Sequence, residues 1–257
     1  MATRAADPTY GQDGAGVRFD WGVAGAAALS KGCRALVVVD VLSFTTAVDI
    51  AVSRGIRVHP FPWGAQAHEY GRRVGAAVAV GRGAGDAEHP WTLSPAALAT
   101  APFVENLVLP SPNGSAICAT ASATGLPVLA ACARNAGAVA RWLRSHGFGA
   151  MDAPVGVVAA GEQWPDGRLR PCVADLLGAA LVLDGLVDSP GGLSVEAAMT
   201  VATLAARPDV SAAIRGCVSG RELAQLGYPL DVEAAAAVGV SEVAPLLRDG
   251  AFHPAVR

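Results

Sequence analysis

LVVVDVLSFTTAVD, residues 36–49, is an apolar run that ends on a carboxylate and continues into a short polar turn and a helix-like segment. A continuous run of Val and Leu is typical of a strand buried on both faces, as in a parallel sheet. Asp40 then lies at the carboxyl end of that strand, the edge at which open α/β sheets bind ligands. The hydroxyls of Ser43, Thr45 and Thr46 follow near a helix start, where free backbone N–H groups favour anions. The pattern fits phosphate chemistry; it also fits an Asp40 that only caps the helix and threonines that only close a turn.

Strand-like and helix-like segments alternate over the first three quarters of the chain. Further strand patterns occur at residues 57–60, 77–81, 107–109, 127–130 and 155–160. This alternation predicts a three-layer α/β/α fold with a mostly parallel sheet that is covered on both faces.

From residue 190 the pattern becomes mainly helical. Helical patterns cover residues 194–206, 210–217, 221–226 and 232–238, and a short tail at 243–252 closes the chain. We therefore expect an α/β core over residues 1–190 that carries a phosphate and metal site. Residues 191–257 are expected to form a mostly helical C-terminal region packed on that core.

Composition excludes several classes of function. The chain has 257 residues, is 52% hydrophobic and carries a net charge of −3, so it can bury a large core but has no basic surface for nucleic acid or membranes. Its five cysteines form no CxxC pair, and the N-terminal stretch lacks the apolar core of a signal peptide. No apolar run is long enough to cross a membrane. We expect a soluble cytoplasmic protein with reduced thiols.

Two further loops carry groups of the same chemical kind as the first. One holds Asn113, Gly114 and Ser115 just before a helical pattern, and the other holds Glu162 and runs to Asp175. If all strands are parallel, the three loops share one edge of the sheet. That edge would combine carboxylates for Mg²⁺ with helix starts for phosphate oxygens.

Each of these groups also has a purely structural interpretation. Asn-Gly is a common turn dipeptide, so Asn113 and Gly114 fit a turn. Asp175 lies within an apolar helix pattern, where it is either a solvent-facing residue, a buried paired charge or a metal ligand. Arg82 follows a strand pattern in a long loop, where it either binds an anionic group or is simply solvated. The five histidines show no HxxxH or HxH spacing, which argues against zinc.

Several segments in order resemble the 2-phosphosulfolactate phosphatase (ComB-like) family. The resemblance covers about residues 32–252. The segments are VVVDVLSFTTAVDIA (37–51), VGRG (80–83), PWTLSP (90–95), LPSPNGSAI (109–117), ACARNAGAVARWL (131–143), VGVVAAGEQWPDGRLRPCVADLLGAALVLDGL (155–186) and SGRELAQLGYPLDVEAAAAVGVSEVAPLLRDGAF (219–252).

The resemblance implies a three-layer α/β fold and a Mg²⁺-dependent phosphatase for a small acidic phosphate monoester. The family reaction converts 2-phospho-3-sulfolactate and water into 3-sulfolactate and phosphate. On this hypothesis Asp40 and Asp175 are metal ligands, and Glu162 orients the attacking water unless Asp40 is itself a nucleophile. The residues expected to bind the substrate and its phosphate are Ser43, Thr45, Thr46, Arg82, Asn113, Gly114 and Ser115. The expected partner is a small anionic molecule, with a homo-oligomer as a further expectation.

One loop and two positions depart from the family pattern. The family's glycine-rich GFDxGNSP loop is replaced by AEHPWTLSP at residues 87–95. The family's DVLRATTT segment falls on residues 40–47, which places Ser43 where the family has arginine. The family's Glu-Asp pair falls on Ala174 and Asp175, so one carboxylate is replaced by a methyl group. The alternative hypothesis is therefore a non-catalytic or repurposed relative that binds a small anion.

Overall fold

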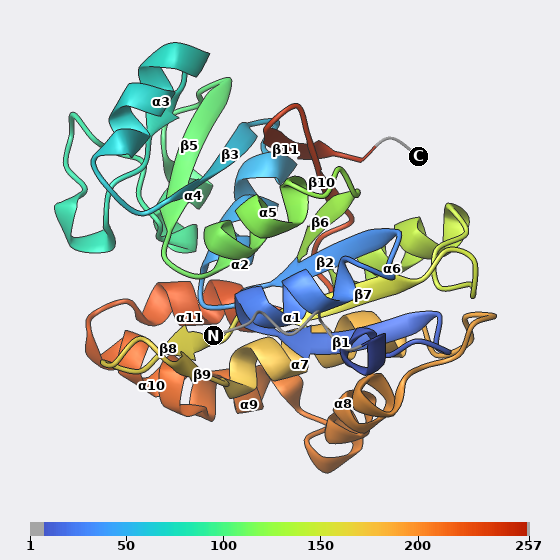
Figure 1. Ribbon diagram of the computed structural model, residues 1–257. Coiled ribbons are helices and arrows are strands. Elements are labelled where there is room, and N and C mark those ends of the chain that lie inside the picture. Colours follow the sequence, from blue (N-terminus) through green and yellow to red (C-terminus); the bar gives the residue numbers. More distant parts are fainter. Residues whose placement is uncertain (1–7, 256–257) are drawn as a thin grey trace.

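The computed structural model describes residues 8–255, and within them nine strands form one large sheet (Figure 1). The order across the sheet is β1-β7-β2-β6-β10-β11-β3-β5-β4. These strands are β1 (Val17–Trp21), β2 (Ala35–Val39), β3 (Arg57–Pro62), β4 (Ala77–Val78), β5 (Asn106–Ser111), β6 (Val128–Ala131), β7 (Val155–Ala159), β10 (Pro245–Arg248) and β11 (Ala251–Pro254). A separate hairpin consists of β8 (Glu162–Gln163) and β9 (Leu169–Arg170), within the segment expected to be a loop.

Helices connect most of the strands and make up most of the chain after residue 190. They are α1 (Gly22–Leu29), α2 (Phe44–Ser53), α3 (Gln66–Val74), α4 (Pro95–Thr100), α5 (Gly114–Ser122), α6 (Ala136–Ser145), α7 (Val173–Asp184), α8 (Val195–Ala206), α9 (Val210–Gly216), α10 (Val218–Gln225) and α11 (Pro229–Ala236). The predicted α/β class with a mostly parallel sheet is confirmed. Of the helices in residues 8–255, none combines the length and apolar character that crossing a membrane requires.

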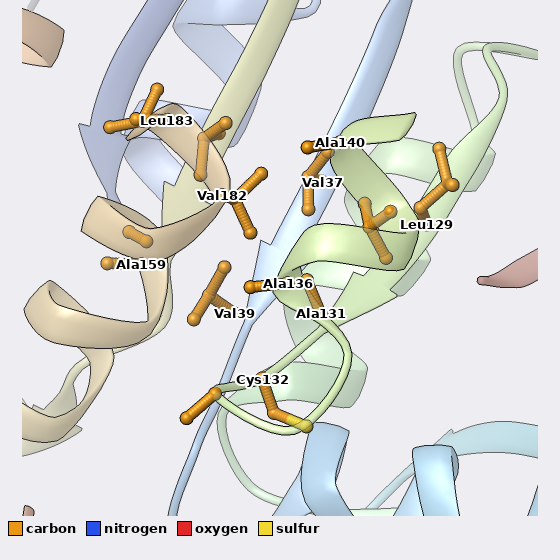
Figure 2. Close-up of a cluster of buried hydrophobic side chains, with 14 of the residues drawn as sticks. Val37, Val39, Leu129, Ala131, Cys132, Ala136, Ala140, Ala159, Val182 and Leu183 are labelled. Atoms are coloured by element: carbon orange, nitrogen blue, oxygen red, sulfur yellow. The ribbon is translucent and has the colours of Figure 1, made fainter. Parts of the chain in front are cut away.

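The strand predicted from the Val-rich run is the centre of both hydrophobic layers. All five residues of β2 are fully buried, and they alternate between the two faces of the sheet. Val37 and Val39 pack in one layer with α6 and α7, as Figure 2 shows. Leu36 and Val38 pack in the opposite layer with α1, α2 and α5. The sheet is therefore covered on both faces, because side chains of a strand point alternately to either side.

The sheet contains two parallel blocks that run in opposite directions. One block is β1-β7-β2-β6, and the other is β3-β5-β4. The hairpin β10-β11 lies between them and is antiparallel to β6 on one side and to β3 on the other. Three successive reversals make β5 run opposite to β2. From the sequence, the three loops were expected to share one edge of the sheet if all strands were parallel. The strands are not all parallel, so this condition does not explain how the loop after β5 reaches the site.

The C-terminal segment 243–252, expected to be a tail, forms most of this hairpin. Leu246 and Phe252 are buried in the sheet, and the turn between the strands is formed by Asp249 and Gly250. Both turn residues have positive φ, 51° and 81°, as a tight hairpin turn requires. The division at residue 190 remains a prediction, but the last strands of the second part lie inside the sheet of the first.

Candidate active site

Asp40 is placed by the buried strand that precedes it. It follows directly after β2 and is 6% exposed. Its Oδ1 accepts a hydrogen bond from the backbone N–H of Phe44 at 3.3 Å, and its Oδ2 accepts one from Gly114 at 2.9 Å. The carboxylate thus caps the first turn of α2, as the structural interpretation expected. It also connects α2 to the start of α5, which the sequence pattern did not predict.

The approach of α5 to Asp40 depends on the absence of a side chain at residue 114. A Cβ on Gly114 would lie 2.7 Å from Oδ2 of Asp40 and would overlap the ring of Phe44. Real Cβ atoms do not approach other atoms so closely, so only glycine lets the helix start reach the carboxylate. The Asn-Gly dipeptide is therefore more than a turn signal here, because the glycine is needed for contact with a group 74 residues away.

Asp175 joins the loops that follow two neighbouring strands. It lies in the first turn of α7 and is 2% exposed, which excludes a solvent-facing side chain. Its Oδ1 accepts the backbone N–H of Val41 at 2.7 Å, after β2, and its Oδ2 accepts that of Gly161 at 2.9 Å, after β7. The thiol of Cys172 also donates to Oδ2 at 3.1 Å. Among residues 8–255 no arginine, lysine or histidine forms an ion pair with this carboxylate.

The two buried carboxylates destabilise each other's charged form. Burial raises the pKa of Asp40 to about 6, against a lowering by its backbone hydrogen bonds and by the charge of Arg82. Burial, and then the charge of Asp40, raises the pKa of Asp175 to about 7. A single positive group near Asp40 does not compensate for two desolvated negative charges. Near neutral pH the pair therefore holds a proton or attracts a cation.

Asp40 and Asp175 supply carboxylate oxygens, the ligand type that a hard cation prefers. Within the described residues, no cluster of three or more His, Cys, Asp or Glu side chains is arranged to hold a metal ion. Mg²⁺ in proteins typically takes one or two carboxylates and completes its shell with water and substrate phosphate oxygens. Three of the four carboxylate oxygens accept one N–H bond each and retain a second lone pair, whereas Oδ2 of Asp175 accepts from both Gly161 and Cys172. The donor set of Asp40 and Asp175 is thus compatible with Mg²⁺.

The hydroxyl groups of the predicted phosphate site are engaged by the backbone. Thr45 donates to the carbonyl of Asp40 at 2.7 Å and accepts from the N–H of Asp40 at 2.9 Å. Thr46 donates to the backbone carbonyl five residues earlier, and Ser115 donates to the one four residues earlier. A hydroxyl has one proton, so in this arrangement none of the three donates to a phosphate. The structure supports the turn-closing alternative for them, and their phosphate-binding roles remain predictions.

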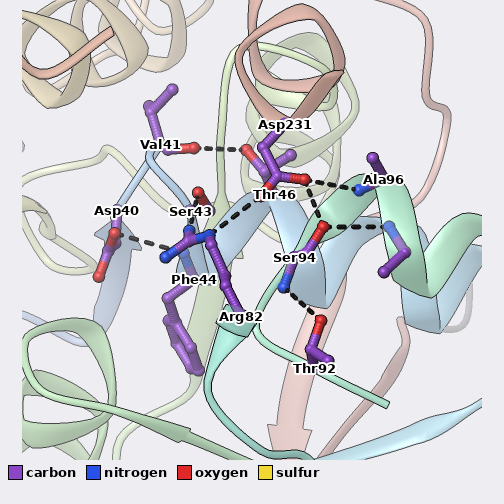
Figure 3. A network of polar contacts seen from close by, with 11 residues as sticks. Asp40, Val41, Ser43, Phe44, Thr46, Arg82, Thr92, Ser94, Ala96 and Asp231 are labelled. Carbon is purple, nitrogen blue, oxygen red and sulfur yellow. Dashed lines mark hydrogen bonds and ion pairs between the residues drawn. The ribbon is translucent and has the colours of Figure 1, made fainter. Parts of the chain in front are cut away.

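Arg82 is not a solvated loop residue. It lies just after the strand β4 in a 3₁₀ helix (Arg82–Ala84), and its side chain is 20% exposed. Figure 3 shows its guanidinium between the turn that carries Asp40 and Ser43 and the helix α11. Nη2 donates to the hydroxyl of Ser43, and Nε donates to Asp231 at 3.0 Å. The positive guanidinium of Arg82 therefore lies beside Ser43, the position at which the family pattern has an arginine.

Asn113 and Glu162 lie on the walls of a neighbouring cavity of about 230 Å³. The side chain of Asn113 makes no capping hydrogen bond to α5. The carboxylate of Glu162 pairs with Arg170 across the β8-β9 hairpin. Glu162 follows Gly161, whose N–H binds Asp175, so the cavity borders the loop that holds the carboxylate pair.

The structure therefore brings together most of the predicted residues, in two groups. Asp40, Asp175, Gly114, Ser43 and Arg82 are joined by hydrogen bonds or by their mutual charges. Glu162 and Asn113 share the adjacent cavity. Sequence reasoning missed Asp231, because the helical pattern covers residues 232–238 and Asp231 lies one residue before it. The available signal was its place in the first turn of a helix that begins at a proline.

The fold is that of an α/β protein, and its candidate site combines acidic side chains with a helix start and an arginine. The model of the 2-phosphosulpholactate phosphatase family matches residues 26–250, and the chain belongs to this family. The resemblance inferred from the sequence segments is confirmed. At the level of the family this indicates a phosphatase, that is, a phosphoric monoester hydrolase. None of the curated proteins compared with the chain matches it.

Proposed function

We propose that the protein is a Mg²⁺-dependent phosphatase that hydrolyses a phosphate monoester of a small acid. The proposed reaction is 2-phospho-3-sulfolactate and water to 3-sulfolactate and phosphate, or the same reaction on a similar substrate. The supporting observation is the convergence of Asp40 and Asp175, two buried and mutually repelling carboxylates, with the start of α5 at Gly114. The proposed partner is a small anionic molecule, and the proposed location is the cytoplasm.

In this proposal Asp40 and Asp175 hold Mg²⁺. When bound, the ion offsets negative charge on the phosphate oxygens and on the departing oxygen. Arg82 supplies a fixed positive charge for an oxygen of the substrate, since its guanidinium is anchored at Ser43 and Asp231. The start of α5 adds the positive end of a helix next to Asp40.

Two routes of attack on phosphorus are open to these residues. In the first, Glu162 orients a water molecule in the cavity that it shares with Asn113. In the second, a carboxylate oxygen of Asp40 attacks phosphorus while the ester P–O bond breaks, and the departing alkoxide takes a proton from water. A water molecule then hydrolyses the phosphoaspartate, which releases phosphate and restores Asp40. The Glu162→Gln variant separates them, because only the first route needs a carboxylate at residue 162 for attack on the substrate.

The experiment is phosphate release from a panel of phosphosulfolactate and phospholactate, with Mg²⁺ or with a chelator. We expect turnover that requires Mg²⁺ and falls about 10²–10³-fold in Asp40→Asn, the range expected for loss of a group central to charge stabilisation. Asp49→Asn is a matched control, because Asp49 is also a buried carboxylate but is bound to Arg134 and Ser241. Metal-independent release, or equal release by Asp40→Asn, would defeat the proposal.

A second candidate function is anion binding without hydrolysis. Ala174, fully buried in α7, supplies no carboxylate beside Asp175 at the position of the family's glutamate. The hydroxyls of Thr45, Thr46 and Ser115 also donate to backbone carbonyls. Stabilisation by inorganic phosphate and sulfolactate in thermal unfolding, with no phosphate release from any ester, would favour this candidate.

A further inference from the structure

The guanidinium of Arg82 is held by groups from distant parts of the chain (Figure 3). Its Nε donates to Oδ2 of Asp231 at 3.0 Å, 149 residues away, and its Nη2 donates to Ser43. Its Cζ also lies 5.9 Å from the centre of the Tyr228 ring, just before α11. Among residues 8–255 nothing accepts a hydrogen bond from Nη1, so both protons of this nitrogen are available to a ligand.

Asp231 is itself fixed by a complete set of donors. It is 1% exposed, and its Oδ1 accepts the hydroxyl of Ser94 and the backbone N–H of Ala96 at 3.1 Å. Those two donors belong to the start of α4, so the carboxylate cannot turn away from Arg82 without leaving a buried donor unpaired. A charge-assisted hydrogen bond from a carboxylate held in this way fixes the direction of the guanidinium.

The anchored guanidinium lies at the turn that carries the candidate site. Ser43, which accepts from Nη2, follows Asp40 by three residues, and Figure 3 shows Arg82 between this turn and Asp231. Asp231 accepts from Nε while Ser43 accepts from the neighbouring Nη2, and Asp231 is sealed from solvent. It can therefore act on a ligand only through Arg82.

We infer that Asp231 is a positioning residue: it fixes Arg82 so that Nη1 is presented to an oxyanion group of the ligand, a phosphate, carboxylate or sulfonate. This inference rests on the proposed function for the identity of the ligand. The C-terminal helix α11 thereby determines part of the binding geometry without contacting the substrate.

The chain contains a matched control for this pair. Asp49 is fully buried, its Oδ2 accepts from Nε of Arg134 at 2.8 Å, and its Oδ1 accepts from Ser241 at 2.6 Å. The two arginine side chains are also alike in exposure, 19% for Arg134 and 20% for Arg82. Asp49→Asn and Asp231→Asn therefore make the same chemical change in the same kind of ion pair. Only the second ion pair contacts Ser43.

The first test is a double-mutant cycle on the full chain with phosphosulfolactate. We expect Asp231→Asn to raise KM about tenfold and to leave kcat within about twofold, because a mispositioned arginine weakens ground-state and transition-state binding alike. In an Arg82→Gln background, Asp231→Asn should have no further effect on KM. Asp49→Asn should lower stability and leave KM unchanged. An unchanged KM in Asp231→Asn, or the same increase in the Arg82→Gln background, overturns the inference.

A second measurement does not depend on turnover. The Nε–H proton of Arg82 should give a slowly exchanging NMR signal that disappears in Arg82→Gln and in Asp231→Asn and persists in Asp49→Asn. If the wild-type protein hydrolyses nothing, the proposed function fails. The Kd for inorganic phosphate and this signal then test the positioning alone: a persisting signal in Asp231→Asn, or an unchanged Kd, overturns it.

A smaller change covers the case in which Asp231→Asn does not fold. Ser94→Ala removes one donor to Asp231 and leaves no buried charge unpaired. We expect about a threefold rise in KM or in the Kd for phosphate, and no change in the control Ser241→Ala. Equal values for the two serine variants overturn the inference.

Discussion

Replacing Gly114 by alanine tests whether the start of α5 forms part of the site. The added Cβ would lie 2.7 Å from Oδ2 of Asp40 and would overlap the ring of Phe44, which is 1% exposed. Overpacking of this kind costs about 1–3 kcal/mol, and loss of the N–H bond to the Asp40 carboxylate adds about 1–2 kcal/mol. We expect the free energy of unfolding to fall by about 2–5 kcal/mol, or Tm by roughly 4–20 °C.

The assay is urea unfolding of the full chain, together with phosphate release in Mg²⁺. Gly137→Ala is the control, because Gly137 also lies in the first turn of a helix that follows a strand. There a Cβ meets only the flexible end of Arg141, at 3.4 Å. That variant should be neutral or up to about 1 kcal/mol more stable, since alanine favours helix. Wild-type stability and turnover in Gly114→Ala would refute the role of this helix start.

Three other predictions follow from the buried groups and the C-terminal hairpin. Without metal, the free energy of unfolding should fall as pH rises from about 4 to about 7, because the folded state keeps protons on Asp40 and Asp175 that the unfolded state has lost. In Asp175→Asn, the free energy of unfolding measured with urea should depend less steeply on pH. Added Mg²⁺ should stabilise the wild type more at pH 8 than at pH 5.5. An equally steep pH dependence in both proteins contradicts the prediction. Gly250→Val should lower the free energy of unfolding by about 1–3 kcal/mol, because φ at this turn residue is 81° and a β-branched side chain is strained there. Circular dichroism melts measure the change, and an unchanged Tm contradicts the prediction. A thiol reagent should modify the partly buried Cys217 first and the four buried cysteines only on unfolding, because burial raises the thiol pKa of each of those four. Mass spectrometry after partial labelling identifies the order, and early labelling of a buried thiol contradicts the prediction.

The sequence alone was enough to predict the central strand and the helix after it. A run of Val and Leu that ends on Asp40 has no polar face, so it is stable only when both faces are covered, and β2 is buried in both layers. The helical patterns after residue 190 were also predictable, because each places apolar residues at helical spacing. Such local patterns depend only on neighbours in the chain, and they place Asp40 at the end of its strand.

The partners of that carboxylate were decided by the tertiary structure. The Asp249-Gly250 turn has the sequence of a local hairpin. Backbone hydrogen bonds between strands are the same for every residue type, so the local sequence does not show which strands lie beside this hairpin. That it pairs with β6 and β3, and so reverses the direction of half of the sheet, was not predictable from the local sequence. The contact of Gly114 with Asp40 spans 74 residues and that of Arg82 with Asp231 spans 149. Whether such groups are solvated or buried against each other depends on how distant elements pack. The sequence therefore determined which chemical groups are available, and the packing of the sheet and α11 decided which of them meet.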